Sequence, residues 1–220
     1  MISILFPFIG NLSLGHHLSY WARALPGISM LILLGDCSSL APRAVENIVW
    51  DQQRVLLENL NDWQLGGRVN VRYEGESHTP RIRWQQLDSE YNIRLWGTFN
   101  AGNTRIIGRP GNVTMEHDGD VRTANSPENL ILQQLGYELP VSYLEFWIRG
   151  LPAPKSNADL TFNELNQLSQ MFQDGWTIVY PDPRQYGSLT LPRRVDVSRP
   201  ENDILLRFIG LNWTLAENSN

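Results

Sequence analysis

Alternation of apolar and polar residues is the feature that most limits how this chain can fold. In residues 67–74, GRVNVRYE, the apolar side chains of Val69, Val71 and Tyr73 fall on one face of an extended chain. Similar strand-like segments are residues 81–85, 90–96, 104–108, 112–123, 165–172, 175–181, 189–198 and 203–213. A period of two is typical of half-buried antiparallel strands, so the sequence predicts a meander of ten or so strands.

Three further segments have helical patterns. Residues 46–61 place their apolar side chains near one face of a helix. A second helix should follow Ser126 as its N-cap and stop at Gly136, and a third should open with Ser142 and Glu145 as a capping box. The third helix is apolar on nearly all sides, so another element must cover it.

Together these elements predict a mainly β, α+β fold. One strongly curved antiparallel sheet would wrap around apolar side chains, and the short helices would close one side as a lid. Eight tryptophans supply bulky apolar side chains for the inner face of that sheet. The inner face can be a filled core or a ligand cavity, and the residue pattern leaves both open.

The charge of the chain bears on its partners. Its formal net charge is -5 at pH 7. Proteins that bind nucleic acids concentrate Lys and Arg to neutralise backbone phosphates. We therefore expect no nucleic-acid partner.

The single cysteine, Cys37, follows an apolar run at residues 28–34 that is too short to span a bilayer. This order is typical of the export signal of a bacterial lipoprotein, in which the cysteine is acylated after cleavage. Asp36 departs from that pattern, and a buried strand with an incidental cysteine is the alternative. The lipoprotein interpretation divides the chain into a leader (residues 1–36), an acylated cysteine with a flexible tether (37–47) and one lipoprotein-binding half-barrel domain (48–220).

The segment MEHDGD is the strongest candidate for catalytic or metal-binding chemistry, because Glu116, His117, Asp118 and Asp120 lie close together in it. Neighbouring residues on a strand point to opposite faces, and Asp-Gly is typical of a hairpin turn, which favours a turn here. The sequence has no nucleophile elbow and no glycine-rich phosphate loop. We expect no enzyme, no metal and no cofactor; a hydrolase that uses Glu116 or Asp118 is the alternative.

Several stretches carry a resemblance to a known family. They are Cys37, the spaced residues Leu56, Trp63, Leu65, Gly67, Arg68 and Val69, then RIRWQQ, RPGNV, LPVSYLEFWIRGLPAP, and the closing GWTIVY and ILLRFIGLNW. In this order, from about residue 48 to 213, they resemble the outer-membrane lipoprotein receptor family LolB. The resemblance implies an open antiparallel β-barrel of about 10–11 strands, with short helices forming a lid over an apolar cavity for lipoprotein acyl chains.

The resemblance also implies a function. The protein would be lipid-anchored through Cys37 in the outer membrane and face the periplasm. As a monomer, it would accept lipoproteins from a LolA-like periplasmic carrier and insert them into outer-membrane lipid. Strand parity assigns to the acyl-chain cavity Val69, Val71, Trp84, Ile93, Leu95, Phe146, Trp147, Trp176, Ile178, Leu206 and Phe208. Another kind of periplasmic lipid carrier, or an outer-membrane scaffold whose filled barrel binds a protein partner, is the alternative.

The turn of one predicted hairpin contains Thr98, Phe99 and Asn100, where the LolB family usually has Pro-Leu-Gly. The family carries its exposed leucine on a protruding loop associated with delivery to the membrane. Phenylalanine is also apolar, so the resemblance implies that Phe99, flanked by Thr98 and Asn100, forms a membrane-insertion loop. A ring folded back on its own hairpin is the alternative.

Overall fold

The computed structural model of the chain describes residues 48–97, 103–136 and 139–216. The chain divides between residues 43 and 44 into two units, and the described residues all belong to the second. The predicted leader and tether with Cys37, and the predicted insertion loop with Thr98, Phe99 and Asn100, lie outside the described residues.

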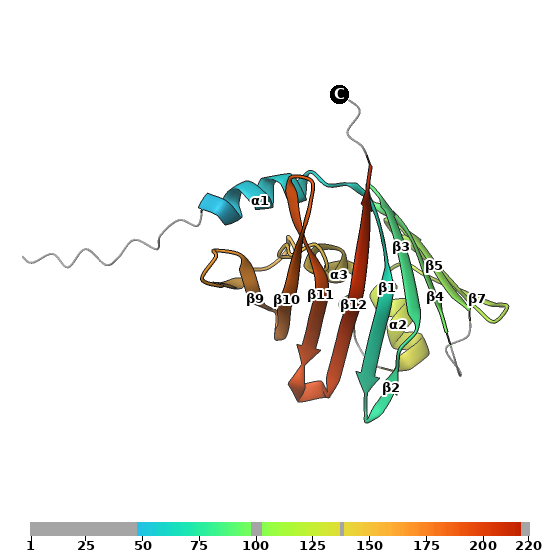
Figure 1. Cartoon of the computed structure of the whole chain (residues 1–220). Coiled ribbons are helices and arrows are strands. Elements are labelled where there is room, and N and C mark those ends of the chain that lie inside the picture. Colours follow the sequence, from blue (N-terminus) through green and yellow to red (C-terminus); the bar gives the residue numbers. More distant parts are fainter. Residues whose placement is uncertain (1–47, 98–102, 137–138, 217–220) are drawn as a thin grey trace, which may run out of the picture. The chain divides into compact units, whose positions relative to one another are not determined.

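One antiparallel sheet of twelve strands makes up most of the described residues (Figure 1). The strands are β1 (Asp62–Tyr73), β2 (Glu76–His78), β3 (Arg81–Leu87), β4 (Glu90–Trp96), β5 (Thr104–Arg109), β6 (Asn112–His117), β7 (Asp120–Ala124), β8 (Asp159–Phe162), β9 (Leu168–Gln173), β10 (Trp176–Tyr186), β11 (Leu189–Arg199) and β12 (Ile204–Leu215). Their order is β7-β6-β5-β4-β3-β1-β12-β11-β10-β9-β8, with β2 paired to β1. The order runs from β7 to β8 without closing, so the predicted open antiparallel sheet is confirmed.

Two of these strands have no counterpart among the predicted segments. β2 has three residues, all of them exposed, and so it lacks an apolar face that a sequence pattern could reveal. β8 has four residues and forms one edge of the sheet. Both are too short for alternation to distinguish them from a loop.

β3 shows most clearly how alternation places the residues. Ile82, Trp84 and Gln86 are buried, and the residues between them are exposed. Side chains on a strand alternate between the two faces, so β3 has one inner and one outer face. Directly paired residues on neighbouring strands share a face, which extends this inner face across the sheet.

Three helices accompany the sheet: α1 (Ile48–Glu58), α2 (Pro127–Leu135) and α3 (Val141–Trp147). A short 3₁₀ turn, η1 (Pro200–Asn202), joins β11 to β12. α2 has the predicted ends: the Ser126 hydroxyl accepts a 3.2 Å hydrogen bond from the Asn129 amide, and Gly136 adopts φ 76°. A left-handed residue of this kind commonly ends a helix, and glycine adopts it without strain.

The predicted capping box of the third helix is wrong. α3 begins at Val141, with Pro140 as its N-cap, and no side chain of the cap residue accepts a hydrogen bond there. The amide of Ser142 donates instead to Glu128 Oε1 of α2, at 2.7 Å. A carboxylate from the neighbouring helix has therefore taken the capping role, and it ties α2 to α3.

Candidate functional site

One half of the inner face is filled. Trp147 of α3 is completely buried, and its ring centroid lies 6.1 Å from that of Trp176 on β10. The Tyr180 hydroxyl donates a 2.9 Å hydrogen bond to the Trp147 carbonyl oxygen. Ile178, between Trp176 and Tyr180 on the same face, is also fully buried. α3 therefore covers the sheet over Trp176 and Ile178 of β10.

Gln173 holds this seal in place from β9. Its side chain is fully buried, and its Oε1 accepts hydrogen bonds from the Trp147 indole at 2.7 Å and from the Ala153 amide at 2.9 Å. Its Nε2 donates to the carbonyl oxygens of Ala153 and Ser156. A buried amide with all these partners satisfied rigidifies what it joins. α3 and the loop after it are thus fixed to the sheet.

The other half of the inner face is hollow. A cavity of about 580 Å³ lies between strands β3, β4 and β6 and the helices α2 and α3. Its apolar lining is Trp84, Tyr91, Ile93, Val113, Pro127, Val141 and Phe146. Polar side chains also line it, namely Asn61, Asp88, Ser89, Arg109, Asn125, Ser126, Ser142, Glu145 and Lys155. Apolar walls with some polar groups, at this volume, are typical of a ligand site.

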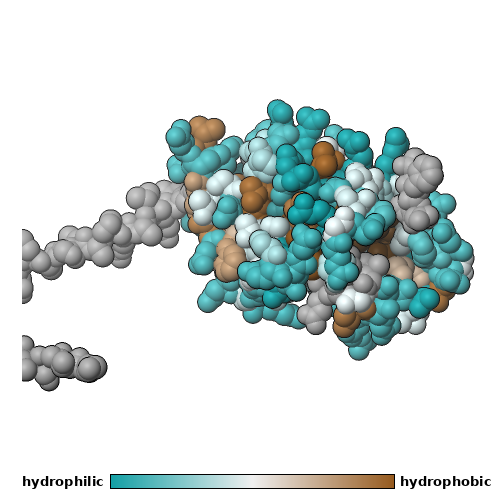
Figure 2. All heavy atoms as spheres, turned by 90° about the horizontal axis from the view of Figure 1, so that it is seen from below, coloured by the Kyte–Doolittle hydropathy of each residue, from teal (hydrophilic) through white to brown (hydrophobic). Residues whose placement is uncertain are grey.

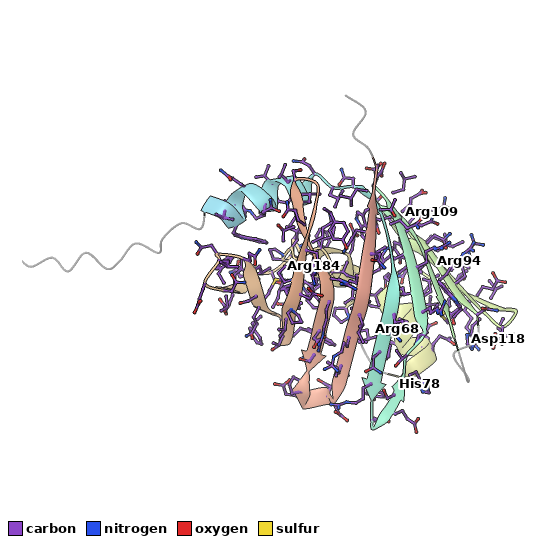
Figure 3. The ribbon with its side chains drawn as sticks, viewed as in Figure 1. Arg68, His78, Arg94, Arg109, Asp118 and Arg184 are labelled. Carbon is purple, nitrogen blue, oxygen red and sulfur yellow. The ribbon has the colours of Figure 1, made fainter. Side chains whose placement is uncertain are left out.

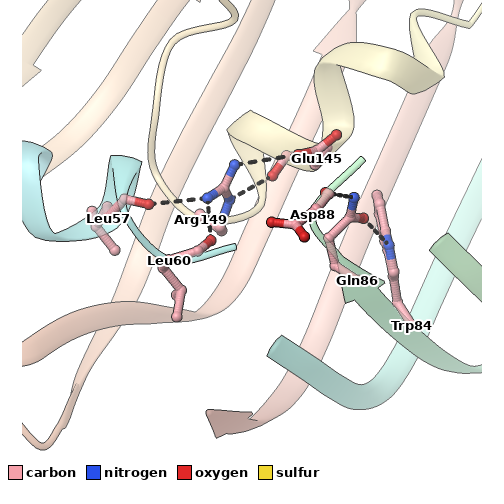
Figure 4. Close-up of polar contacts among 7 residues, drawn as sticks. All are labelled: Leu57, Leu60, Trp84, Gln86, Asp88, Glu145 and Arg149. Carbon is pink, nitrogen blue, oxygen red and sulfur yellow. Dashed lines mark hydrogen bonds and ion pairs between the residues drawn. The ribbon is translucent and has the colours of Figure 1, made fainter. Parts of the chain in front are cut away.

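The Trp84 indole presents an apolar ring to the cavity, because its polar atom is already bonded. Its Nε1 donates to Gln86 Oε1 at 3.0 Å, and Gln86 Nε2 donates to the Asp88 carbonyl oxygen at 2.8 Å (Figure 4). Gln86 is itself buried, so this chain of bonds satisfies it as well. An apolar guest can cover the ring without displacing a hydrogen bond.

Tyr91 lies beside Trp84, with ring centroids 6.5 Å apart. Its hydroxyl is buried and has no hydrogen-bond partner among the described residues. Burial raises the pKa of Tyr91 far above its ordinary value, and the negative charges of Glu128 and Glu145 raise it further. The side chain is therefore neutral at all physiological pH values and adds no charge to the cavity.

Arg149, just past α3, anchors the lid to α1. Only 4% of its surface is exposed. Its Nη1 donates to the carbonyl oxygens of Leu57 and Leu60 at 3.0 and 2.8 Å, and its Nη2 lies 3.5 Å from Glu145 Oε1 (Figure 4). Burial lowers the pKa of Arg149, and the charge of Glu145 opposes that shift. For Glu145, burial raises the pKa and Arg149 lowers it.

The predicted cavity residues divide into two groups. Trp84, Ile93 and Phe146 line the hollow half. The others belong to the apolar core or pack against it, outside that lining: Val69, Val71, Leu95, Trp147, Trp176, Ile178, Leu206 and Phe208. Strand parity placed these side chains on the inner face, but it does not indicate which part of that face a helix covers.

Tyr91, Val113 and Val141 line the cavity but were not among the predicted cavity residues. Tyr91 shares its strand face with Ile93, and Val113 shares one with the buried Met115, so alternation could have found both. Val141 depends on where α3 begins, which the predicted capping box misplaced.

A catalytic site, a metal site or a membrane-spanning helix has little support in the described residues. MEHDGD forms the β6–β7 hairpin, with Asp118 and Gly119 at positive φ in the turn, as predicted. The described residues contain no group of three or more His, Cys, Asp or Glu side chains placed to hold a metal ion. Among those same residues, no helix has both the length and the apolar character needed to cross a membrane.

Apolar surface is scattered on the outside of the molecule. Figure 2, a view from below, shows brown apolar patches separated by hydrophilic side chains. Large exposed apolar residues include Leu165, in the turn between β8 and β9, and Val121, on β7. Scattered residues of this kind are normal for a folded protein, so the cavity beside α2 and α3 is the stronger candidate for an apolar ligand.

Known proteins resemble this chain over most of its length. The family model for "Outer membrane lipoprotein LolB" matches residues 61–213. An outer-membrane lipoprotein LolB from Chromohalobacter salexigens is 38% identical over 201 residues, which cover 90% of this chain and 93% of that protein. The same-named protein from Stutzerimonas stutzeri is 36% identical and covers 84% of this chain and 91% of its own length.

Solved structures show the fold at much lower identity. A candidate outer membrane lipoprotein-sorting protein domain from Vibrio parahaemolyticus superposes with a TM-score of 0.50 at 9% identity. The match covers 77% of this chain and 92% of that one. The predicted resemblance is confirmed by the sequence matches: the chain belongs to the LolB family of outer-membrane lipoproteins.

Proposed function

We propose that this chain receives the acyl chains of lipoproteins in the cavity beneath α2 and α3 and then passes them into the outer membrane. The observation that carries the proposal is the division of the inner face into a sealed half and a hollow half of about 580 Å³. The hollow half is lined by Trp84, Ile93, Val113 and Phe146. In a scaffold with a filled barrel, side chains would occupy that space.

The energetics explain why a receptor is required. Burial of one methylene is worth about 0.8 kcal/mol, so an acyl chain of ~16 carbons carries about 12 kcal/mol of unfavourable surface in water. A lipoprotein released into the periplasm would therefore not cross it unaided. Full burial of three such chains would exceed the practical limit of about 20 kcal/mol for non-covalent affinity. Partial cover is consistent with a cavity that must also release its cargo.

We propose that the cargo comes from a LolA-like periplasmic carrier and that the receptor acts as a monomer. Transfer from one apolar cavity to another, and then into lipid, requires no bond to form or break. Acceptance, holding and release therefore need neither a catalytic residue nor a cofactor. The supporting observation is the chemistry of the cavity wall, where the aromatic and aliphatic side chains of Trp84, Ile93 and Phe146 offer an acyl chain apolar surface.

The remaining parts of the proposal concern residues that the structure does not describe. Residues 1–36 would be the leader, and residues 37–47 would tether the domain of residues 48–220 to the membrane through acylated Cys37. Several acyl chains on one cysteine make membrane association lasting, whereas one makes it marginal. Phe99 would contact lipid between Thr98 and Asn100, in the segment that joins β4 to β5.

Uptake of acyl chains by a soluble form tests this proposal. The Cys37→Ala chain removes the anchor and should accept a lipoprotein from a loaded periplasmic carrier in the absence of membrane. Ile93→Trp in that background adds a large ring to the cavity wall and should reduce uptake at least tenfold. Ile107→Trp is the matched control, because Ile107 is exposed on the adjacent strand and its ring would lie outside the cavity. Equal uptake by both variants, at equal thermal stability, would contradict the proposal.

A further inference from the structure

The outer face of the sheet carries a row of arginines. Arg83 on β3 pairs directly with Arg94 on β4, and Arg94 pairs with Arg105 on β5. Arg68 on β1 pairs with Arg81 on β3 in the same way. Directly paired residues lie on the same face, opposite the buried inner residues such as Ile82 and Ile93. We call Arg68, Arg81, Arg83, Arg94 and Arg105 the arginine patch.

The arginines of the patch outnumber the carboxylates that line the same surface: Glu116 lines a hollow with Arg83, Arg94 and Arg105. None of its five arginines forms an ion pair with a described carboxylate. Glu116 pairs with Arg105 in register but forms no ion pair with it. Elsewhere on the sheet, Asp196 accepts hydrogen bonds from both Arg194 and Arg207, at 2.7 to 3.2 Å. The sheet therefore holds Arg194 and Arg207 in ion pairs with Asp196, whereas the five arginines of the patch form no ion pair with a described carboxylate.

Like charges directly opposite each other on neighbouring strands destabilise a sheet. The row of Arg83, Arg94 and Arg105 across β3, β4 and β5 contains two such like-charged pairs. This occurs in a chain whose net charge is -5. The side chains of Arg83 and Arg94 are exposed, so packing in the folded chain does not offset this repulsion. An anionic partner outside the chain would compensate for it.

An aromatic ring lies within the patch. Trp96, the last residue of β4, pairs in register with Arg81. Two hollows of about 410 and 450 Å³ share Trp96 and Arg83 in their lining. The first also contains Arg94 and Arg105, and the second also contains Arg68 and Arg81. In Figure 3, Arg68 and Arg94 lie on the half of the sheet away from Arg184.

We propose that the arginine patch, with Trp96, binds the anionic phospholipid headgroups of a bilayer surface. Tryptophan is enriched at the membrane interface, and clusters of basic residues bind anionic lipid. The combination of both on one exposed face favours lipid over an acidic protein surface, which would need no interfacial tryptophan. This proposal rests on the proposed function, because the arginine patch would hold the end of β4 against the membrane that receives the cargo.

Binding to vesicles of defined composition tests the proposal. The full chain with Cys37→Ala is mixed with vesicles of phosphatidylcholine alone or of phosphatidylcholine and phosphatidylglycerol, and the bound fraction is measured by flotation. The test variant replaces Arg83, Arg94 and Arg105 by Gln. The control variant replaces Arg54, Arg184 and Arg193 by Gln, which removes the same charge from exposed positions outside the patch.

The parent should bind the anionic vesicles more strongly than the neutral ones, and salt should weaken that binding, since exposed charges are screened. Each basic residue at an anionic surface contributes about fivefold, so the test variant should lose about a hundredfold in affinity. The control variant should lose less than about fivefold. Equal losses in both variants, or a parent without preference for anionic vesicles, would overturn the proposal.

Cargo acceptance in solution separates this proposal from the proposed function. Without vesicles, the test variant should accept lipoprotein from a loaded carrier as well as the parent does. If the parent itself accepts no cargo, the proposed function fails whatever the vesicle data show. If the test variant loses acceptance but keeps vesicle binding, the partner of the patch is an acidic protein surface and the lipid proposal is wrong.

Discussion

The ring of Tyr91 on β4 packs directly on the backbone of Gly108, its register partner on β5. A methyl group at Gly108 would overlap the Cζ and Oη atoms of that ring. The glycine therefore allows an aromatic side chain of the cavity wall to lie flat on the sheet, and a larger residue would force it out of place.

Gly108→Ala should destabilise the protein by about 1–3 kcal/mol, the usual effect of forcing an extra carbon into a packed site. The measurement is urea unfolding followed by circular dichroism. Gly66→Ala is the matched control, because a Cβ there would meet no atom within 4 Å and the residue also lies in a strand. If the two substitutions had equal effects, Tyr91 would not be fixed by Gly108.

The buried hydroxyl of Tyr91 predicts a dependence of stability on alkaline pH. Folding raises the pKa of Tyr91 above the ordinary value of about 10, so the folded state keeps its proton after the unfolded state has lost it. The stabilisation is complete below about pH 10 and falls as the pH rises toward the folded pKa. Tyr91→Phe should be near neutral at pH 7, because it removes a buried hydroxyl that has no partner.

The same substitution should make the loss of stability above about pH 10 less steep, by at most about 1.4 kcal/mol per pH unit. Urea unfolding at a series of pH values measures that slope. The buried Tyr180, whose pKa burial also raises, keeps its own contribution in both proteins. An unchanged slope in Tyr91→Phe would show that the Tyr91 hydroxyl is solvated in the folded protein.

Arg149 supplies a third prediction. Its replacement by Met removes the donors to Leu57 and Leu60 and leaves Glu145 without its ion-pair partner in a partly buried site. Breaking such a pair from one side costs about 3–5 kcal/mol. Arg54→Met is the control, because its pair with Glu58 is exposed and worth less than about 1 kcal/mol. Urea unfolding of both variants gives the difference, and a small effect at Arg149 would show that it does not anchor the lid.

Much of the fold follows from the sequence because alternation is a local property. The buried set Ile82, Trp84 and Gln86 on β3 has the parity that the apolar residues predicted, and α2 has the predicted cap and stop. The confirmed family and the open sheet agree with the predicted outer-membrane lipoprotein receptor.

The division between sealed and hollow halves could not be predicted in the same way. It depends on contacts between distant segments, such as the Glu128 carboxylate that caps α3 and the Gln173 amide that fixes Trp147. Both are polar side chains, and neither belongs to an apolar period. Val69 and Ile93 have the same alternation in sequence, yet only Ile93 lines the cavity.

Phe99 remains a prediction from the sequence. Phe99→Glu should leave acceptance of cargo in solution intact and block its insertion into vesicles, because a charged side chain is costly in the bilayer. Phe99→Leu is the control and should preserve insertion, since it keeps an apolar side chain. Transfer of a radiolabelled lipoprotein to vesicles measures both steps, and loss of acceptance in Phe99→Glu would assign the ring to the folding core.

In the proposed function, acyl chains occupy the hollow half of the inner face. A lipoprotein whose acyl chain carries a photoreactive diazirine, loaded onto the Cys37→Ala chain and irradiated, tests it most directly through mass spectrometry of the labelled residues. We expect labels on Trp84, Ile93, Val113 and Phe146, with few on the sealed Trp147 and Trp176. Labels confined to outer-face residues such as Ile107, or an absence of labelling despite bound cargo, would contradict it.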